Sequence, residues 1–336
     1  MIEKLLEIQD LAVEYRTDTT TVYAVNHINL TIHKGEHVGL VGETGAGKTT
    51  TALSVLNLVP SPPGVVTHGK VNFEGLDLLS LEEKRLSMIR GKKISMIFQD
   101  PMTSLNPVYT VGDQIAELIL LHEKCSKANA RDEACKMLEL VGIPARRYDE
   151  YPHQFSGGMK QRVVIAMSIA CSPDLILADE PTTALDVTIQ AQVLELINEL
   201  KIKFNTAMLL ITHDLGVVAQ VCDSVNIMYS GEIVESGSVP EVFDHPAHPY
   251  TMGLFSSIPT IEGTENRLIP IPGQMPDPSV LPDGCPFASR CAYASSLCHT
   301  HKPKVTELDG SHKVTCLNYE NQVHSSELME AYHNGR

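Results

Sequence analysis

Hydrophobic and polar residues alternate along residues 5–34 of the chain. The alternation has the two-residue period of half-buried strands and predicts two or three of them, over 5–9, 12–16 and 22–32. Other runs are short and apolar, which is typical of strands buried on both faces of a parallel sheet. They lie at 38–41, 93–99, 175–180 and 207–212. Together these patterns predict an α/β fold.

Helical periodicity dominates from residue 111 to about residue 172. The helices expected there form an insert between two strands of the α/β core, and they span 111–123, 129–141 and 161–171. Beyond residue 257 the periodicity weakens, and the prolines of 259–283 predict a linker. We therefore expect a main domain over 1–258, with a helical subdomain at about 100–172, and a C-terminal extension over 259–336.

The apolar run at 38–41 leads into a glycine-rich loop of the form G-x-x-x-x-G-K-T, and a helix is expected after it, over 50–58. This order makes a phosphate cradle, because glycines turn backbone N–H groups towards an anion and the helix N-terminus adds positive charge. Lys48 would reach the β- and γ-phosphates of a nucleoside triphosphate, and the Thr49 hydroxyl would bind Mg²⁺. The expected contacts are Gly42, Glu43, Thr44, Gly45, Ala46, Gly47, Lys48, Thr49 and Thr50. The alternative is an ordinary glycine-rich turn.

Two further apolar strands end in side chains suited to phosphate chemistry. Asp179 and Glu180 end the strand at 175–180, where Asp179 is expected to hold Mg²⁺ and Glu180 to polarise the attacking water. His213 follows the strand at 207–212, and the carboxyl end of a core strand faces the ligand crevice of an open α/β sheet. The alternatives are a solvated strand end and a structural histidine.

Other candidate ligand contacts are less specific. Tyr15 ends a predicted strand before the glycine loop and could stack on an adenine ring; Tyr23 is the rival, and an ordinary strand tyrosine is the alternative. Ser156, Gly157 and Gly158 stand before the last helix of the insert. That arrangement can bind an anion, although serine and glycine are also common helix caps.

Composition narrows the functional classes. The formal net charge is −15, from 26 basic and 41 acidic residues, which disfavours non-specific binding to nucleic acid. The first residues lack the pattern of a signal peptide, and no apolar run approaches the ~18 residues that span a bilayer. Any membrane role is therefore expected to come through a partner.

Four of the eight cysteines lie close together in the C-terminal region, at Cys285, Cys291, Cys298 and Cys316. The segment is rich in loops, and the chain lacks the pattern of a signal peptide, so this grouping favours a metal site over disulfides. The spacing is wider than the paired C-x-x-C of most zinc ribbons and is compatible with an iron–sulfur cluster. Zinc, and free or disulfide-bonded thiols, are the alternatives.

In their order, these motifs resemble those of the ATPase subunits of ABC transporters. The resemblance covers about residues 5–240, and Met159 replaces the glutamine usual in the family. It adds a Q-loop at Gln99, a signature at 156–158, a Walker B pair at Asp179 and Glu180, a D-loop at 184–186 and an H-loop at His213. It implies a P-loop NTPase core with an antiparallel β subdomain, a helical insert and a loop-rich, cysteine-containing extension.

The resemblance also implies a mechanism. Two subunits would pack head to tail, so that the signature residues and Asp186 of one serve the nucleotide of the other. Glu180, His213 and Gln99 would be catalytic: Glu180 activates water, His213 holds the γ-phosphate and that water in line, and Gln99 senses Mg²⁺. Thr49, Gln99 and Asp179 would hold the Mg²⁺ ion. A groove near residues 100–110 would receive a helix of the membrane subunit.

Within the family, the chain is similar to the peptide branch of dipeptide, oligopeptide and nickel importers, and most similar to the subunit designated D. The features are FQDPMTSLNP at 98–107, Phe155, HPAHPYT at 245–251 and GCPF at 284–287. This similarity implies ATP-driven import of peptides, or alternatively of nickel or another small solute, and it favours a 4Fe-4S cluster on the four cysteines.

The implied partners are two integral-membrane permease subunits, a second ATPase subunit (F-type or another copy) and, indirectly, an extracytoplasmic peptide-binding protein, but no nucleic acid. The implied location is peripheral, at the cytoplasmic face of the bacterial inner membrane. A soluble ABC ATPase acting on nucleic acid or ribosomes is the rival, and the single signature and the acidic composition argue against it.

Overall fold

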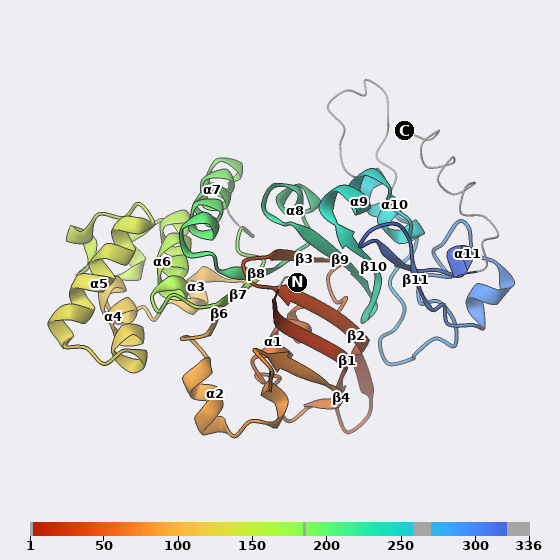
Figure 1. The fold of residues 1–336 in the computed structure, drawn as a ribbon, viewed down its shortest axis with the longest axis horizontal. Coiled ribbons are helices and arrows are strands. Elements are labelled where there is room, and N and C mark those ends of the chain that lie inside the picture. Colours follow the sequence, from red (N-terminus) through yellow and green to blue (C-terminus); the bar gives the residue numbers. More distant parts are fainter. Residues whose placement is uncertain (1–2, 184–185, 258–269, 321–336) are drawn as a thin grey trace.

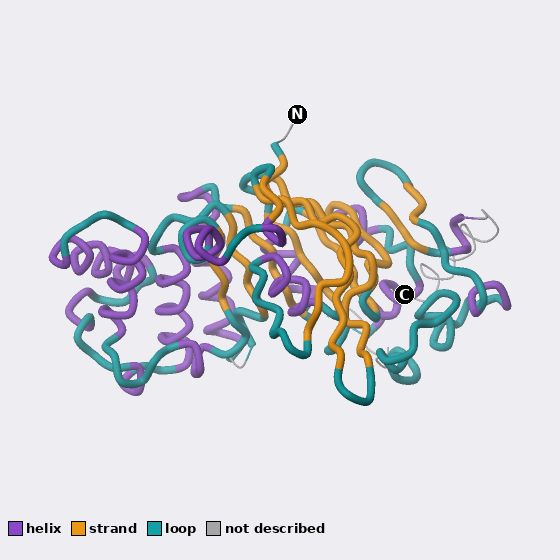
Figure 2. Tube along the Cα trace, turned by 90° about the horizontal axis from the view of Figure 1, so that it is seen from below, coloured by secondary structure: helices purple, strands orange, loops and turns teal. Residues whose placement is uncertain are grey.

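The computed structural model describes residues 3–183, 186–257 and 270–320. Two sheets lie at the centre of an elongated molecule, with a helical subdomain at one end and the C-terminal region at the other (Figure 1). Figure 2 shows the strands gathered between these two ends. The predicted α/β fold is therefore confirmed.

The first sheet is antiparallel and has the order β2-β1-β4-β5. Its strands are β1 (Lys4–Arg16), β2 (Thr21–His33), β4 (Gly64–Phe73) and β5 (Leu76–Asp77). The stretches 5–9 and 12–16 belong to the single strand β1, because an irregularity at Asp10, which has a φ of 51°, bends the strand without ending it.

The second sheet has eight strands in the order β11-β12-β10-β9-β3-β8-β7-β6. Strands β6, β7, β8, β3 and β9 run parallel, and β10, β12 and β11 continue the sheet with antiparallel pairing. The strands are β3 (His37–Val41), β6 (Ile94–Ile97), β7 (Leu175–Asp179), β8 (Ala207–Thr212), β9 (Ser224–Tyr229), β10 (Glu232–Ser238), β11 (Val305–Glu307) and β12 (Lys313–Thr315). The parallel strands are apolar along their length because both of their faces are covered.

The helices cover the sheets and build the insert. The insert holds α3 (Pro101–Ser104), α4 (Val111–His122), α5 (Lys127–Leu140) and α6 (Gly157–Ile169). The others are α1 (Lys48–Val55), α2 (Glu83–Ile89), α7 (Val187–Phe204), α8 (Leu215–Val221), α9 (Val239–Asp244), α10 (Pro249–Ser256) and α11 (Leu317–Glu320). Short 3₁₀ turns span Leu78–Ser80, Ala145–Arg147, Pro152–Gln154 and Ser296–His299.

Two helix boundaries differ from the prediction for local reasons. α1 ends at Val55 rather than at 58, because Asn57 adopts a left-handed conformation with φ 51° that stops the helix. α6 begins at Gly157 rather than at 161, because the Ser156 hydroxyl accepts a hydrogen bond from the Met159 N–H and caps the helix.

The C-terminal region is fastened to the second sheet. β12 pairs with β10, and the buried Glu235 carboxylate of β10 accepts hydrogen bonds from His312 at 2.7 Å and from the backbone N–H groups of Ala247 at 2.6 Å and His248 at 2.8 Å. The predicted boundary between 258 and 259 and the first part of the predicted linker, 259–269, lie outside the described residues. Residues 270–283 contain no helix or strand.

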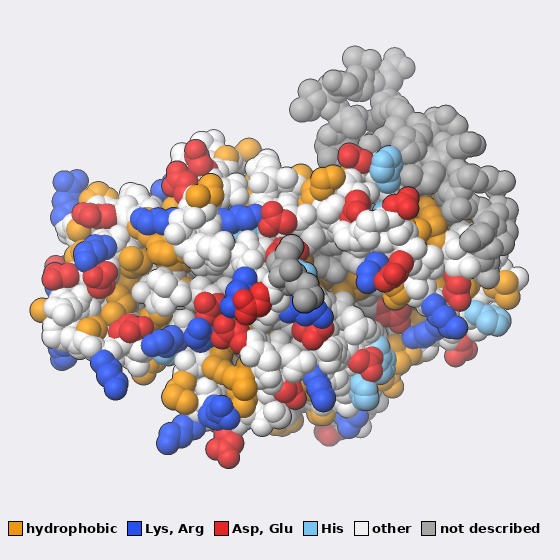
Figure 3. Space-filling view, viewed as in Figure 1, with side chains coloured by type: hydrophobic (Ala, Val, Ile, Leu, Met, Phe, Trp, Pro, Cys, Tyr) orange, Lys and Arg blue, Asp and Glu red, His pale blue; other side chains and the backbone are white. Residues whose placement is uncertain are grey.

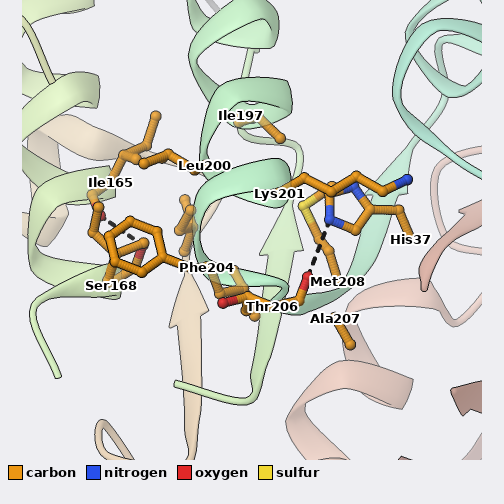
Figure 4. A pocket seen from close by; sticks show the side chains of 13 residues that line it. His37, Ile165, Ser168, Ile197, Leu200, Lys201, Phe204, Thr206, Ala207 and Met208 are labelled. Atoms are coloured by element: carbon orange, nitrogen blue, oxygen red, sulfur yellow. Dashed lines mark hydrogen bonds between the residues drawn. The ribbon is translucent and has the colours of Figure 1, made fainter. Parts of the chain in front are cut away.

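A small, partly open cavity lies between α6, α7 and the second sheet (Figure 4). It measures about 30 Å³ and is lined mainly by apolar side chains such as Ile165, Leu200 and Phe204. His37 borders it, with Nε2 3.3 Å from the Thr206 carbonyl oxygen, and burial lowers the pKa of this histidine to about 4. The cavity has room for no more than a water molecule, so it is part of the core rather than a ligand site.

None of the described helices is long and apolar enough to cross a membrane.

Candidate active site

The glycine-rich loop between β3 and α1 has a shape that only glycine allows. Gly47 has a φ of 104°, and a Cβ atom on it would lie 2.2 Å from the Ala24 carbonyl oxygen. Lys48 begins α1, and its Nζ donates to the carbonyl oxygens of Gly42 at 2.7 Å and Glu43 at 2.9 Å. The predicted order of strand, loop and helix is present, with the helix N-terminus directly after the loop.

The carboxyl ends of β6, β7 and β8 bring three predicted residues into contact. The Glu180 carboxylate lies after β7, 3.0 Å from His213 Nδ1, and it accepts a hydrogen bond from the Gln99 amide at 2.9 Å. Thr183, which the sequence did not single out, donates to the same carboxylate at 2.9 Å. Parallel strands end at one edge of their sheet, so residues far apart in sequence meet there.

Burial and hydrogen bonding set the protonation of this cluster. Burial raises the pKa of Asp179, and the hydrogen bond from the Thr49 hydroxyl opposes the rise only in part. Burial also acts to raise the pKa of Glu180, but the hydrogen bonds from His213, Thr183 and Gln99 outweigh it, so the pKa of Glu180 lies below its ordinary value. Glu180 is therefore ionised at neutral pH, as a general base must be.

An open cleft of about 440 Å³ joins the loop to this cluster. Its lining includes Thr44, Gly45, Gly47, Lys48, Thr49, Thr50, Gln99, Glu180 and His213. Tyr15 lines the cleft and lies 3.2 Å from the Thr50 hydroxyl, whereas Tyr23 is not among the lining residues. Three other lining residues, Val22, Ala24 and Pro278, were not predicted, because nothing in their local sequence marks them as ligand contacts.

The residues of the predicted signature and D-loop lie away from this cleft. Ser156 caps α6, and Asp186 caps α7 by accepting from the Ile189 N–H at 2.9 Å. A Cβ atom on Gly158 would lie 2.3 Å from Ile189, so this glycine is needed where α6 meets α7. Within the described part of the chain, none of these residues lines the cleft. Residues 184 and 185 of the predicted D-loop lie outside the described residues.

Two family models match the sequence. The model described as "ABC transporter" matches residues 25–183, and the one described as "Oligopeptide/dipeptide transporter, C-terminal region" matches residues 234–298. The oligopeptide transport ATP-binding protein OppD of Bacillus subtilis is 53% identical over 279 residues, which are 82% of this chain and 78% of that protein. The chain belongs to the ABC transporter family. The family expected from the order of motifs is confirmed.

Two further comparisons place this ABC ATPase more closely. The dipeptide transport ATP-binding protein DppD of Bacillus subtilis is 50% identical over 317 residues, which are 94% of this chain and 95% of that protein. The ATP-binding cassette MJ0796, solved as a dimer bound to ADP and Pi, has a TM-score of 0.63 and 27% identity. That match covers 70% of this chain and 98% of MJ0796, and it shows the ABC ATPase fold.

The predicted metal centre in the C-terminal region of this ABC ATPase is wrong. No group of three or more His, Cys, Asp or Glu side chains in the described ranges could hold a metal ion, and this contradicts the 4Fe-4S cluster and the zinc alternative. Instead, burial raises the thiol pKa values, to about 12 for Cys285 and about 11 for Cys291 and Cys316. These thiols, with Cys298, surround a narrow space beside Phe287 and serve as small packing groups.

Proposed function

We propose that this ABC ATPase is the ATP-hydrolysing subunit that powers import of di- or oligopeptides through a membrane permease complex. The observation that carries the proposal is the ionised Glu180, held by His213 and Gln99 at the edge of the cleft that begins at the glycine-rich loop. The peptide substrate is supported by the match of 234–298 to the oligopeptide/dipeptide C-terminal region and by relatives named for oligopeptide and dipeptide transport.

The cleft residues have the chemistry that ATP and Mg²⁺ need. Mg²⁺ prefers oxygen ligands. The Thr49 hydroxyl lines the cleft and is hydrogen-bonded to the buried Asp179 carboxylate, so these two side chains are suited to hold the ion. Bound there, the ion would neutralise charge on the phosphates. In our proposal Lys48 binds the β- and γ-phosphates, Glu180 takes the proton of the attacking water, and His213 orients the γ-phosphate.

We further propose that two ATPase subunits close over each nucleotide. Ser156, Gly157, Gly158 and Asp186 lie outside their own cleft, which supports a role towards the nucleotide of a partner subunit, and MJ0796 has been solved as a dimer. The partner subunit would be a second copy or a related subunit, such as the F-type ATPase that the family resemblance implies. Residues 259–336 would form the family's C-terminal extension.

The partners in the membrane would be two permease subunits, with this chain peripheral at the cytoplasmic face. Exposed apolar side chains near the predicted docking groove, Phe98, Val108 and Tyr109, support such a contact. Acidic and basic side chains are interspersed on the face in Figure 3, a surface better suited to protein contacts than to nucleic acid.

Co-purification tests the transporter function. The tagged chain, expressed with its natural neighbours and extracted in mild detergent, should bring down integral-membrane subunits, and the reconstituted complex should take up peptide only when ATP is supplied. A chain that purifies with RNA or ribosomes, or a complex whose peptide uptake does not depend on ATP, would contradict the proposal.

Tyr15→Ala is expected to weaken binding of a fluorescent ATP analogue by about tenfold, because loss of an aromatic stack removes on the order of 1–3 kcal/mol. Tyr23→Ala is the matched control, because Tyr23 lies on the neighbouring strand β2 and is not among the described residues that line the cleft. This variant should bind the analogue as the wild type does. Equilibrium titration measures both dissociation constants. The opposite order of effects would assign the stacking role to Tyr23.

A further inference from the structure

The C-terminal region contacts the glycine-rich loop through a buried arginine. The side chain of Arg290 is only 5% exposed, and its guanidinium donates to the Glu43 carboxylate at 3.0 Å. The same side chain donates to the Pro272 carbonyl oxygen at 2.8 Å and to the Tyr229 hydroxyl at 3.2 Å. Arg290 therefore ties residue 43 of the loop to the extension and to β9.

A second contact from the extension reaches the cleft itself. The Tyr23 N–H donates to the Pro278 carbonyl oxygen at 2.8 Å, which anchors the segment 272–278 beside β2. Pro278 lines the cleft together with Tyr15 and Val22. Pro278 thus adds a residue of the C-terminal region to the wall of the cleft.

The charge on Glu43 explains why this connection matters. Glu43 is the only acidic residue between Gly42 and Thr49, and its charge acts on the nearby Lys48. An unpaired carboxylate in the loop would repel the phosphates of ATP and would compete with them for Lys48. In the structure, Arg290 pairs with this carboxylate, and the Tyr250 hydroxyl accepts from the Glu43 N–H at 3.0 Å.

We propose that Arg290 is a positioning residue for nucleotide binding, which neutralises and holds Glu43 so that the loop can accept a triphosphate, while Pro278 completes the cleft wall. The extension is then part of the nucleotide site, and removal of its contacts weakens ATP binding rather than the hydrolytic step. This inference rests on the proposed ATPase function.

Titration of a fluorescent ATP analogue into three variants tests the proposal. Arg290→Met should raise the dissociation constant by about tenfold, because the partly exposed Glu43 carboxylate would then face the phosphates with its charge unpaired. The kcat of the assembled complex at saturating ATP should stay close to the wild-type value. Adding Glu43→Gln to Arg290→Met should restore tight binding. Lys302→Met, which breaks the exposed Lys302–Glu232 ion pair (3.0 Å) in the same region, should bind as the wild type does.

Glu43→Gln alone is a second test, because it keeps Arg290 in place and removes only the charge at the partly exposed end of the pair, where the Glu43 side chain is 31% exposed. It should bind the analogue at least as tightly as the wild type; weaker binding would overturn the neutralising role. Wild-type affinity in Arg290→Met, or no rescue in the double variant, would also overturn the proposal. A wild type that binds no nucleotide at all would instead overturn the ATPase function.

Discussion

Glu180→Gln is expected to stop ATP turnover while leaving ATP binding intact. Among the described carboxylates, only that of Glu180, directly after β7, contacts both His213 and Gln99 at the cleft. Its lowered pKa keeps it ionised and able to accept a proton. Glutamine has the same shape but cannot take that proton. The loss of a general base reduces rates by about 10²–10⁴-fold.

The measurement compares kcat of the assembled complex with the dissociation constant of a fluorescent ATP analogue for the same variant. Asp174→Asn is the matched control, because Asp174 precedes the other end of β7 and pairs with Lys93 at 2.6 Å, away from the cleft. It should leave turnover unchanged. Native turnover in Glu180→Gln would show that another group is the base.

Lys48→Ala is expected to weaken ATP binding by about a hundredfold or more, because a largely buried cation that meets phosphate contributes several kcal/mol. The Lys48 ammonium is anchored by the carbonyl oxygens of Gly42 and Glu43, so it already lies over the loop before a nucleotide arrives. Titration with the fluorescent analogue measures the loss, and thermal unfolding checks that the fold is kept.

Lys136→Ala provides the comparison for this second variant. Lys136 is an exposed lysine of α5 that pairs with Glu133 at 2.6 Å on the outside of the helical subdomain. Its removal should not change nucleotide affinity. If Lys48→Ala binds the analogue with wild-type affinity, the glycine-rich loop is not the triphosphate site, and the ATPase function fails with it.

Local features of the sequence predicted the core of the site. The glycine-rich loop depends on conformations that few residues other than glycine adopt, as the φ of 104° at Gly47 illustrates. The apolar strands before Glu180 and His213 were visible from composition alone, and parallel strands place the residues at their carboxyl ends along one edge of the sheet. The family resemblance came from the same short motifs, and the comparisons confirmed it.

The cysteines show where such local reasoning fails. Their spacing suggested ligands, because four thiols within a short segment are uncommon. Spacing, however, does not distinguish a thiol that binds a metal from one that fills the core. In the folded chain Cys285, Cys291 and Cys316 pack in the apolar cluster that contains Tyr229 and Phe287, and burial raises the pKa values of their thiols.

The sequence by itself determined the glycine-rich loop, the polar residues that end the apolar strands, and the helical insert. Each of these features depends on residues that are close together in the sequence. Only the tertiary structure decided which partners those elements meet. Arg290 reaches Glu43 across 247 residues, and Pro278 reaches the cleft because its carbonyl accepts from Tyr23. Such contacts depend on how the C-terminal region packs against β9 and β10, and no local periodicity encodes that packing.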